Sequence, residues 1–310
     1  MLSREIKNII GGRKVLIAVS GGVDSMVLLD LMYREGFNIG VVHFNHMIRD
    51  DSIDDELLVM DYCNSHDIAL YTKAMDILKF CDEMKVSTEL GARMMRHSFF
   101  DEIRKTYNYE YLALAHNADD VAEQMMFAMT RGSGVAGLAG MKEIDQERKI
   151  IRPLLGVFKD DIYKYANENN IKWHEDSSNT ECDYDRNHIR NEIIPSFEAR
   201  RNGVKTVLVR QSQYFSEVNN FIQDALNIWI QSNYQNFSFG REIYQNTHKL
   251  LRGEILKYIW NSMYAINFTS KRLSEVDKWI EHGRGNTTLF FGCSHELFMK
   301  KNIIYVRKKA

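Results

Sequence analysis

Proline and cysteine are scarce in this chain, and long apolar runs are missing. The 310 residues include 2 prolines and 4 cysteines, with no C-x-x-C pair and no zinc-binding spacing. Cysteines so far apart are typical of reduced, structural thiols rather than of a disulfide framework. The chain has no apolar run of about 18 residues, which argues against a transmembrane helix, and its charged first residues lack the apolar segment of an export signal. We therefore expect a globular, cytoplasmic protein with no membrane partner.

Neither charge is in large excess over the whole chain, but its two parts differ. The 42 acidic and 40 basic residues give a formal net charge of −2. Residues 1–199 contain 34 acidic and 23 basic side chains, whereas residues 200–310 contain 8 and 17, so the two parts carry net charges of −11 and +9. Such asymmetry indicates different partners, although two merely solvated surfaces would also explain it. We predict two domains, residues 1–200 and residues 201–310.

Short apolar strands alternate with helical segments in the first domain. The expected strands are residues 15–19, 39–44, 68–72 and 111–116, and the expected helices are residues 26–32, 54–65, 90–106 and 119–130. Strands separated by single helices form βαβ units, whose sheet is parallel and carries helices on both faces. The predicted fold class is therefore α/β, with ligands bound beyond the carboxyl ends of the strands.

A glycine turn follows the first expected strand and begins the first helix. It consists of Ser20, Gly21, Gly22, Val23, Asp24 and Ser25. Two glycines let the backbone approach an anion closely, and the N–H groups at the start of a helix attract phosphate. The two serine hydroxyls can add donors, and Asp24 can hold a magnesium ion. The turn matches neither the Walker loop nor G-x-G-x-x-G, and an ordinary turn that caps the helix is the alternative.

The sequence SGGVDS in this context resembles the PP-loop of the ATP pyrophosphatase superfamily, whose members cleave ATP between its α- and β-phosphates. Further segments fit one branch of that superfamily: His43–Arg49, Ala115–Glu123, Arg131–Gly134, Gly137–Met141, Arg152–Leu155, Trp173–Asn179 and Arg186–Arg190. Together they are similar to the bacterial tRNA(Ile)-lysidine synthetase family over about residues 13–197. Beyond residue 200 the similarity rests on length, basic character and a β-rich end.

The resemblance implies a ligase that uses ATP, Mg²⁺, free L-lysine and the tRNA(Ile) with a CAU anticodon. The C2 oxygen of the wobble cytidine would attack the α-phosphate and release pyrophosphate. The lysine amine would then displace AMP at C2 and give lysidine. Adenylation turns a poor leaving oxygen into a good one, so the protein has to supply positioning and charge neutralisation. A homodimer is included among the expected assemblies.

The resemblance implies four essential residues, which are Asp24, Arg96, Asp120 and Glu123. Asp120 and Glu123 lie three positions apart on one expected helix, so they can share a face. Such a pair could bind ammonium groups or accept the proton of the attacking amine. Acids at a helix N-terminus are also common without either role, because the helix dipole favours them.

Several histidines and arginines complete the candidate site. His46 and His116 are expected to bind ATP, and Arg49, Arg93, Arg186 and Arg190 are expected to contact phosphate groups of ATP or tRNA. Taken alone, an arginine on a helix is more often a solvated surface residue, and the last two arginines could instead pair with the acid-rich residues 175–185. A histidine after a strand is as often structural. Asn117 stands where the family frequently has a second histidine.

The basic second domain begins with a long expected helix, residues 204–235, whose apolar positions repeat at helical spacing. Cations and aromatic side chains are interleaved along it, a combination that suits the phosphates and unstacked bases of RNA. An ordinary helical domain would explain the aromatic residues but not the positive excess. Residues 286–291 and 303–307 predict a small β-rich end. We expect this mainly helical domain to bind tRNA.

Two other functions stay open from the residues alone. A different PP-loop enzyme acting on tRNA, such as one that forms 2-thiocytidine, would lean on sulfur carriers and paired cysteines, and the sequence has no C-x-x-C. A tRNA-binding protein with an inactive nucleotide fold would have no need of Asp24, Asp120 and Glu123.

Overall fold

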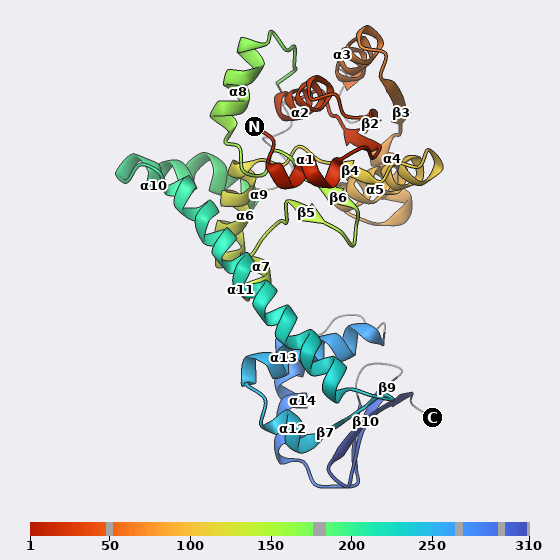
Figure 1. Ribbon diagram of the computed structural model, residues 1–310, viewed down its shortest axis with the longest axis vertical. Helices are drawn as coiled ribbons and strands as arrows, with labels where there is room; N and C mark the ends of the chain where they lie inside the picture. The colour runs from red at the N-terminus through yellow and green to blue at the C-terminus, as the bar shows by residue number, and fades with distance from the viewer. Residues whose placement is uncertain (48–51, 176–183, 264–268, 291–294, 309–310) are drawn as a thin grey trace. The chain divides into compact units, whose positions relative to one another are not determined.

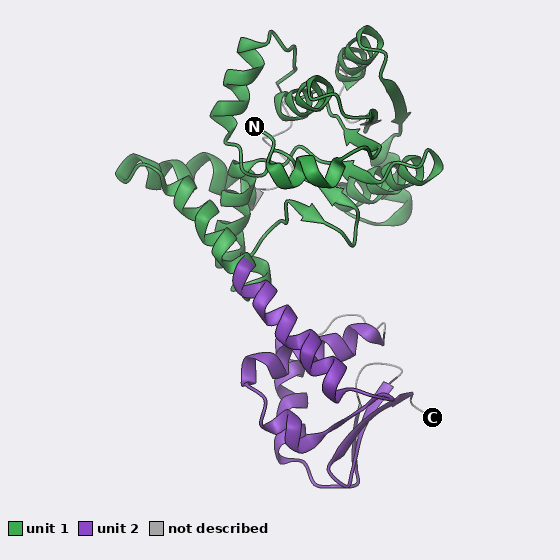
Figure 2. Ribbon diagram, viewed as in Figure 1, with its two compact units in different colours: residues 1–216 green, residues 217–310 purple. Residues whose placement is uncertain are grey.

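The computed structural model describes residues 1–47, 52–175, 184–263, 269–290 and 295–308. The chain forms two compact units, Met1–Ser216 and Glu217–Ala310 (Figure 2). The division falls within helix α11 (Val204–Asn233) rather than at the change of charge near residue 200. The first unit contains 27 basic and 34 acidic residues and the second contains 13 and 8, so their net charges are −7 and +5. Part of the expected basic half therefore belongs to the first unit.

A six-stranded sheet with the order β3-β2-β1-β4-β6-β5 forms the centre of the first unit (Figure 1). Its strands are β1 (Val15–Ala18), β2 (Ile39–Asn45), β3 (Ala69–Ala74), β4 (Tyr111–Ala113), β5 (Ile144–Asp145) and β6 (Ile150–Ile151). Neighbouring strands from β3 to β6 pair in parallel, and β5 pairs antiparallel with β6. The four expected strands are confirmed. The β5–β6 hairpin was missed because strands of two residues are too short to show a pattern.

Helices cover both faces of this sheet, because successive residues of a strand point to opposite sides. Val15 and Ile17 pack in one hydrophobic core, and Leu16 packs in the other. The first core is closed by α1 (Arg4–Ile10), α2 (Val23–Arg34), α3 (Ser52–Ser65) and α8 (Lys159–Glu168), and the second by α4 (Ile77–Met84) and α5 (Thr88–Thr106). The predicted α/β architecture is confirmed, and the two cores hold the strand ends in fixed positions.

A group of helices after β4 has an apolar core of its own. It comprises α6 (Ala118–Thr130), α7 (Val135–Leu138), α9 (Tyr184–His188), the π-helical turn η2 (Ile189–Ile193), α10 (Ile194–Arg200) and the beginning of α11. Ala122 and Met125 of α6 belong to the same buried cluster as Ile189, Ile194 and Leu208. This packing holds α6 close to η2.

The second unit combines helices with a four-stranded antiparallel sheet. The strands follow the order β7-β10-β9-β8, with β7 (Ser238–Gly240), β8 (Thr287–Phe290), β9 (His295–Lys300) and β10 (Ile303–Lys308). The end of α11 packs there with α12 (Arg241–Gln245), α13 (Lys249–Ser262) and α14 (Ser270–His282). Trp229, Tyr244 and Trp260 are buried in this core. The expected helical region with a β-rich end is confirmed. Within the described residues, no helix is long and apolar enough to cross a membrane.

Candidate functional site

Three chain segments that carry candidate residues begin at the carboxyl edge of the first unit's sheet. The glycine turn follows β1, His46 follows β2, and His116 follows β4. The strands β2 and β3 lie on one side of β1, whereas β4 and β6 lie on the other. The order therefore reverses between β1 and β4, and such a switch point is where open α/β sheets bind ligands.

The glycine turn has the geometry of an anion cradle. Gly21 has a φ of 99°, and Gly22 is the N-cap of α2 with extended backbone. The hydroxyl of Ser25 donates to the carbonyl oxygen of Gly22 at 2.9 Å and accepts from the backbone N–H of Ser20 at 3.1 Å. Val23 is buried and anchors the first helical turn in the core. The first N–H groups of α2, which have no partner within the helix itself, can therefore face a phosphate.

Gly21→Ala is expected to destabilise the protein. Alanine disfavours a φ of 99°, and its Cβ would lie 3.1 Å from the Cβ of Asp55. We expect the free energy of unfolding, measured by urea denaturation, to fall by about 1–3 kcal/mol. Gly12→Ala is the matched control, because no heavy atom lies within 4 Å of the added Cβ. Equal losses in the two variants would contradict a special conformation at Gly21.

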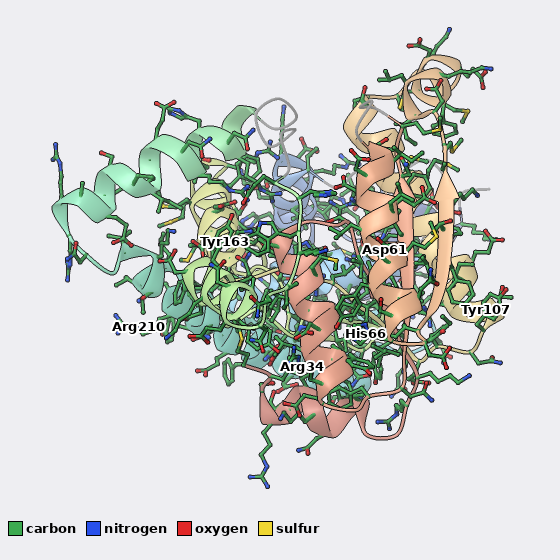
Figure 3. The ribbon with its side chains drawn as sticks, turned by 90° about the horizontal axis from the view of Figure 1, so that it is seen from above. Arg34, Asp61, His66, Tyr107, Tyr163 and Arg210 are labelled. Carbon is green, nitrogen blue, oxygen red and sulfur yellow. The ribbon has the colours of Figure 1, made fainter. Side chains whose placement is uncertain are left out.

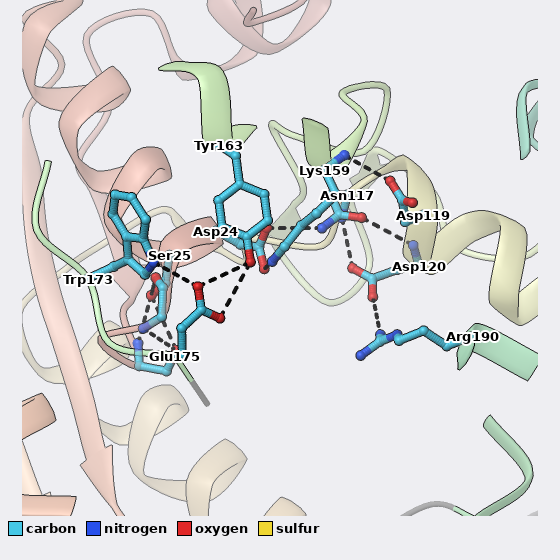
Figure 4. A network of polar contacts seen from close by, with 12 residues as sticks. Asp24, Ser25, Asn117, Asp119, Asp120, Lys159, Tyr163, Trp173, Glu175 and Arg190 are labelled. Atoms are coloured by element: carbon cyan, nitrogen blue, oxygen red, sulfur yellow. Dashed lines mark hydrogen bonds and ion pairs between the residues drawn. The ribbon is translucent and has the colours of Figure 1, made fainter. Parts of the chain in front are cut away.

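Asp24 connects the two sides of the switch point (Figure 4). Its Oδ1 accepts a hydrogen bond from Nδ2 of Asn117 at 3.1 Å, and its Oδ2 lies 2.5 Å from Nζ of Lys159. Asn117 caps α6, since its Oδ1 accepts from the N–H of Asp120 while Oδ2 of Asp120 accepts from the N–H of Asn117. A continuous chain of polar contacts thus runs from Asp24 to Asp120.

Asp120 and Glu123 share Arg190 of η2 as a partner. Arg190 donates from Nε and Nη2 to the two carboxylate oxygens of Glu123, at 2.6 and 2.8 Å. Its Nη2 lies 3.5 Å from Oδ1 of Asp120. Burial raises the pKa of both carboxyl groups, and the positive charge of Arg190 opposes that rise. The two acids therefore lie on one face of α6, in a setting that can bind cations or move protons.

His46 and His116 each have a buried ring nitrogen at this edge that no described residue pairs with. Burial, with a contribution from Arg96, lowers the pKa of His46 to about 4. Burial, followed by the positive charge of Arg152, lowers the pKa of His116 to about 4. The Nδ1 atom of each ring is buried without a hydrogen-bond partner in the part of the chain that the structure describes. Neutral imidazoles with a free nitrogen are suited to a ligand, because buried polar atoms are normally paired.

Arginines surround His116. Arg93 and Arg96 lie on α5 and Arg186 lies on α9, and the charges of all three lower the pKa of His116. Desolvation of its guanidinium, followed by the charge of Arg93, lowers the pKa of Arg96. Positive charges that are held near one another favour the binding of an anionic ligand. Arg49, the other arginine expected here, lies outside the described residues.

The sequence did not indicate that Lys159, Tyr163 and Glu175 belong to this site. Lys159 begins α8, and its Nζ lies 5.3 Å above the ring centroid of Tyr163. The hydroxyl of Tyr163 donates to Glu175 at 3.4 Å, and Nε1 of Trp173 donates to the same carboxylate at 3.1 Å (Figure 4). Trp173 and Glu175 lie in a segment that carries the family resemblance, which is a usable signal. The sequence carries no such signal for Lys159, because a lysine at a helix surface is too common to single out.

A magnesium ion brought by a nucleotide fits the chemistry of Asp24. Among the described residues, no group of three or more His, Cys, Asp and Glu side chains is arranged to hold a metal. Magnesium bound with phosphates needs one or two protein carboxylates, because phosphate and water oxygens complete its coordination. Asp24 can supply one such ligand, and the ion would neutralise phosphate charge there.

Comparison with known families decides the class of this unit. Residues 1–197 match the model of the PP-loop domain. The chain belongs to the PP-loop domain family. This match covers the glycine turn, the polar chain from Asp24 to Asp120 and Arg190.

Relatives of this PP-loop protein include several named tRNA(Ile)-lysidine synthase. The chain is 38% identical to that of Pseudothermotoga lettingae over 60% of this chain and 42% of the relative. It is 37% identical to the synthase of Chlorobaculum tepidum, over 70% of this chain and 66% of the relative. It is 33% identical to the synthase of Clostridium perfringens, over 90% of this chain and 61% of the relative. The chain thus spans 42–66% of the length of these three relatives.

A solved structure shares the fold of this PP-loop protein. The U34-tRNA thiolase NcsA of Methanococcus maripaludis, determined with its [4Fe-4S] cluster, superposes with a TM-score of 0.56 at 23% identity. The match covers 69% of this chain and 77% of that chain. At this identity the likeness concerns the fold.

Proposed function

We propose that this protein ligates free lysine to C2 of the wobble cytidine in the tRNA(Ile) with a CAU anticodon, at the expense of ATP. The observation that carries the proposal is the polar chain from Asp24 through Asn117 to Asp120, which joins an anion cradle to a carboxylate pair. Ligation of an amine after adenylation needs both features in one site. Identities of 33–39% to proteins named tRNA(Ile)-lysidine synthase support the choice of substrates.

The glycine turn is the proposed binding site for the phosphates of ATP. The N–H groups at the start of α2 would bind phosphate oxygens. Nζ of Lys159 contacts Oδ2 of Asp24 next to the glycine turn, so its ammonium group lies close to the proposed phosphate site. His46 and His116 each have an Nδ1 without a described partner, and these atoms are the proposed contacts for the nucleotide.

The carboxylate pair is the proposed site of amine transfer. The C2 oxygen of cytidine attacks the α-phosphorus, and the bond to pyrophosphate breaks. The amine nitrogen of lysine then bonds to C2, while the bond from C2 to the adenylate oxygen breaks and AMP leaves with that electron pair. A carboxylate on α6 accepts the proton that the nitrogen loses. Arg93 and Arg96 would neutralise the charge that develops on phosphate oxygens.

The second unit is the proposed surface for the body of the tRNA. Its 13 basic and 8 acidic residues give it a net charge of +5, which favours contact with phosphates. Exposed lysines without an ion pair to a described residue include Lys271 and Lys278 of α14. Its three tryptophans pack in or against the core, whereas Phe221 and Phe237 are exposed, and the positive charge is the observation on which this assignment rests.

Sulfur transfer to tRNA is the alternative chemistry for this fold. Sulfur transfer uses cysteines that lie close together, whereas the two described cysteines lie apart. Cys63 is buried in the core beneath α2 and α3, and Cys81 is buried in the core beneath α4 and α5, on the opposite face of the sheet. Burial raises the pKa of the Cys63 thiol to about 12, which makes it a poor nucleophile. Neither of these two described thiols is therefore placed for sulfur transfer, which supports lysine ligation.

The proposal is tested with purified protein, ATP, isotopically labelled lysine and tRNA(Ile) that carries a CAU anticodon. We expect label to enter the tRNA with release of AMP and pyrophosphate. The same tRNA with uridine at the wobble position is the matched control and should stay unlabelled. Failure to incorporate lysine, or a requirement for a thiol donor, would show that the proposal is wrong.

A further inference from the structure

The two carboxylates of α6 have unlike surroundings. Both oxygens of Glu123 are engaged by the guanidinium of Arg190, and this side chain is 4% exposed. Asp120 is 27% exposed, and within the described part of the chain its Oδ1 has one hydrogen-bond contact, at 3.5 Å to Nη2 of Arg190. Its Oδ2 accepts from the N–H of Asn117. An incoming amine can therefore reach Oδ1 of Asp120, whereas Glu123 has no oxygen to offer without losing Arg190.

We propose that Asp120 is the carboxylate that meets the substrate amine and that Glu123 acts through Arg190 as a positioning residue. This division of roles rests on the proposed ligase function. When the amine nitrogen bonds to C2 and the bond to the adenylate oxygen breaks, the proton from nitrogen passes to Oδ1 of Asp120 and the electron pair leaves with AMP. Glu123 touches no reacting atom.

The backbone around Arg190 is built to hold this guanidinium. Arg190 lies in the π-helical turn η2, and turns of this kind are frequent at functional sites. The neighbouring Ile189 and Ile194 are buried with Val121 and Met125 of α6. Because one core fixes both backbones, the bidentate contact with Glu123 sets where Arg190 presents Nη2 to Asp120.

The charges around Asp120 predict how each variant shifts its titration. Four charged groups act on or adjoin this side chain, namely Arg190, Arg186, Lys159 and Glu123. In Glu123→Gln, the positive charge of Arg190 is no longer shared with a second carboxylate, so the pKa of Asp120 falls. In Arg190→Gln, the loss of that cation raises the pKa of Asp120.

The pH dependence of lysine transfer distinguishes the two roles. The assay measures transfer of labelled lysine in a single turnover by the full chain, with tRNA(Ile) and ATP, between pH 5 and pH 9. In Asp120→Asn, the rate should fall by about 100-fold or more and the decline at acid pH should disappear. In Glu123→Gln, that decline should persist and move to lower pH. If the fall in rate at acid pH disappeared in Glu123→Gln and persisted in Asp120→Asn, the assignment would be overturned.

A double substitution tests the action of Glu123 through Arg190. Arg190→Gln leaves Glu123 as a buried carboxyl group without its cation, which is costly. Glu123→Gln/Arg190→Gln removes both members, so it should transfer lysine at least about threefold faster than Arg190→Gln alone, and Arg190→Lys should retain part of the activity. A double variant slower than both single variants would overturn the proposal, because it would show that Glu123 acts on the substrate independently.

Thermal unfolding separates this inference from the proposed function, because it needs no substrate. The unfolding midpoint should be lower in Arg190→Gln than in the double variant, and Lys105→Gln, which removes an exposed ion pair to Asp101, should leave it nearly unchanged. Equal midpoints in the single and double variants would contradict the Glu123–Arg190 pairing. Wild-type protein that transfers no lysine would instead refute the ligase function, and with it the role given to Asp120.

Discussion

Asp24→Asn is expected to abolish pyrophosphate release while leaving tRNA binding nearly intact. Asparagine keeps the size of the side chain and can still meet Asn117, but it lacks the charge that holds Lys159 at 2.5 Å and that would bind magnesium. Loss of one preorganised charge in a site for phosphate chemistry lowers the rate by about 100-fold or more. The measurement is pyrophosphate release in the presence of tRNA(Ile), together with tRNA affinity by filter binding.

The matched control for Asp24→Asn is Asp61→Asn on α3. Asp61 is exposed and is labelled in Figure 3, and no ion pair joins it to another described residue. This variant should release pyrophosphate at the wild-type rate. If Asp24→Asn lost tRNA binding together with pyrophosphate release, Asp24 would not be assigned to the nucleotide alone.

Removal of the second unit is expected to weaken tRNA binding strongly and to reduce its dependence on salt. A chain that ends at Ser216 keeps all three hydrophobic cores of the first unit, so we expect it to fold. It loses a net charge of +5. Affinity should fall by about 100-fold at moderate salt, and the slope of log affinity against log salt should become shallower by about 2 or more. Filter binding between 50 and 300 mM KCl, as a roughly physiological range, measures both.

Charge substitutions in the intact chain control for the truncation. Lys271→Gln/Lys278→Gln removes two exposed cations from α14 of the second unit, and Lys14→Gln/Lys105→Gln removes two exposed cations from the first unit. The first pair should reduce the salt slope by about 1 to 2, whereas the second should change it little. Slopes that are unchanged in the truncated chain and in both double variants would mean that the RNA surface lies elsewhere.

The local parts of the site could be predicted from the sequence. The turn Ser20–Ser25 is visible because its glycines, acid and hydroxyls are consecutive, and because an apolar strand precedes them. The shared face of Asp120 and Glu123 follows from their spacing on one helix. The alternation of strands and helices predicted the sheet and both of its helical layers for the same reason, since each signal is contained in a short window.

The contacts that join distant segments could not be predicted in this way. Arg190 was expected at a phosphate or at residues 175–185, most of which lie outside the described residues, and its described partners are Glu123 and Asp120. Lys159 reaches Asp24 only because α8 packs on α2 in the first core. Asn117 departs from the family's usual histidine, yet its amide links Asp24 to Asp120. Each of these partners is set by packing across the fold, which sequence spacing does not encode.

The most direct test of the proposed ligase is the identity of the nucleoside that it makes. Transfer RNA(Ile) with a CAU anticodon is incubated with the protein, ATP and lysine, then digested to nucleosides and analysed by mass spectrometry. Our proposal predicts that the wobble cytidine gains the mass of lysine minus water and that fragmentation leaves lysine on the base at C2. An unmodified wobble cytidine, a sulfur-containing cytidine, or lysine attached to the ribose would contradict it.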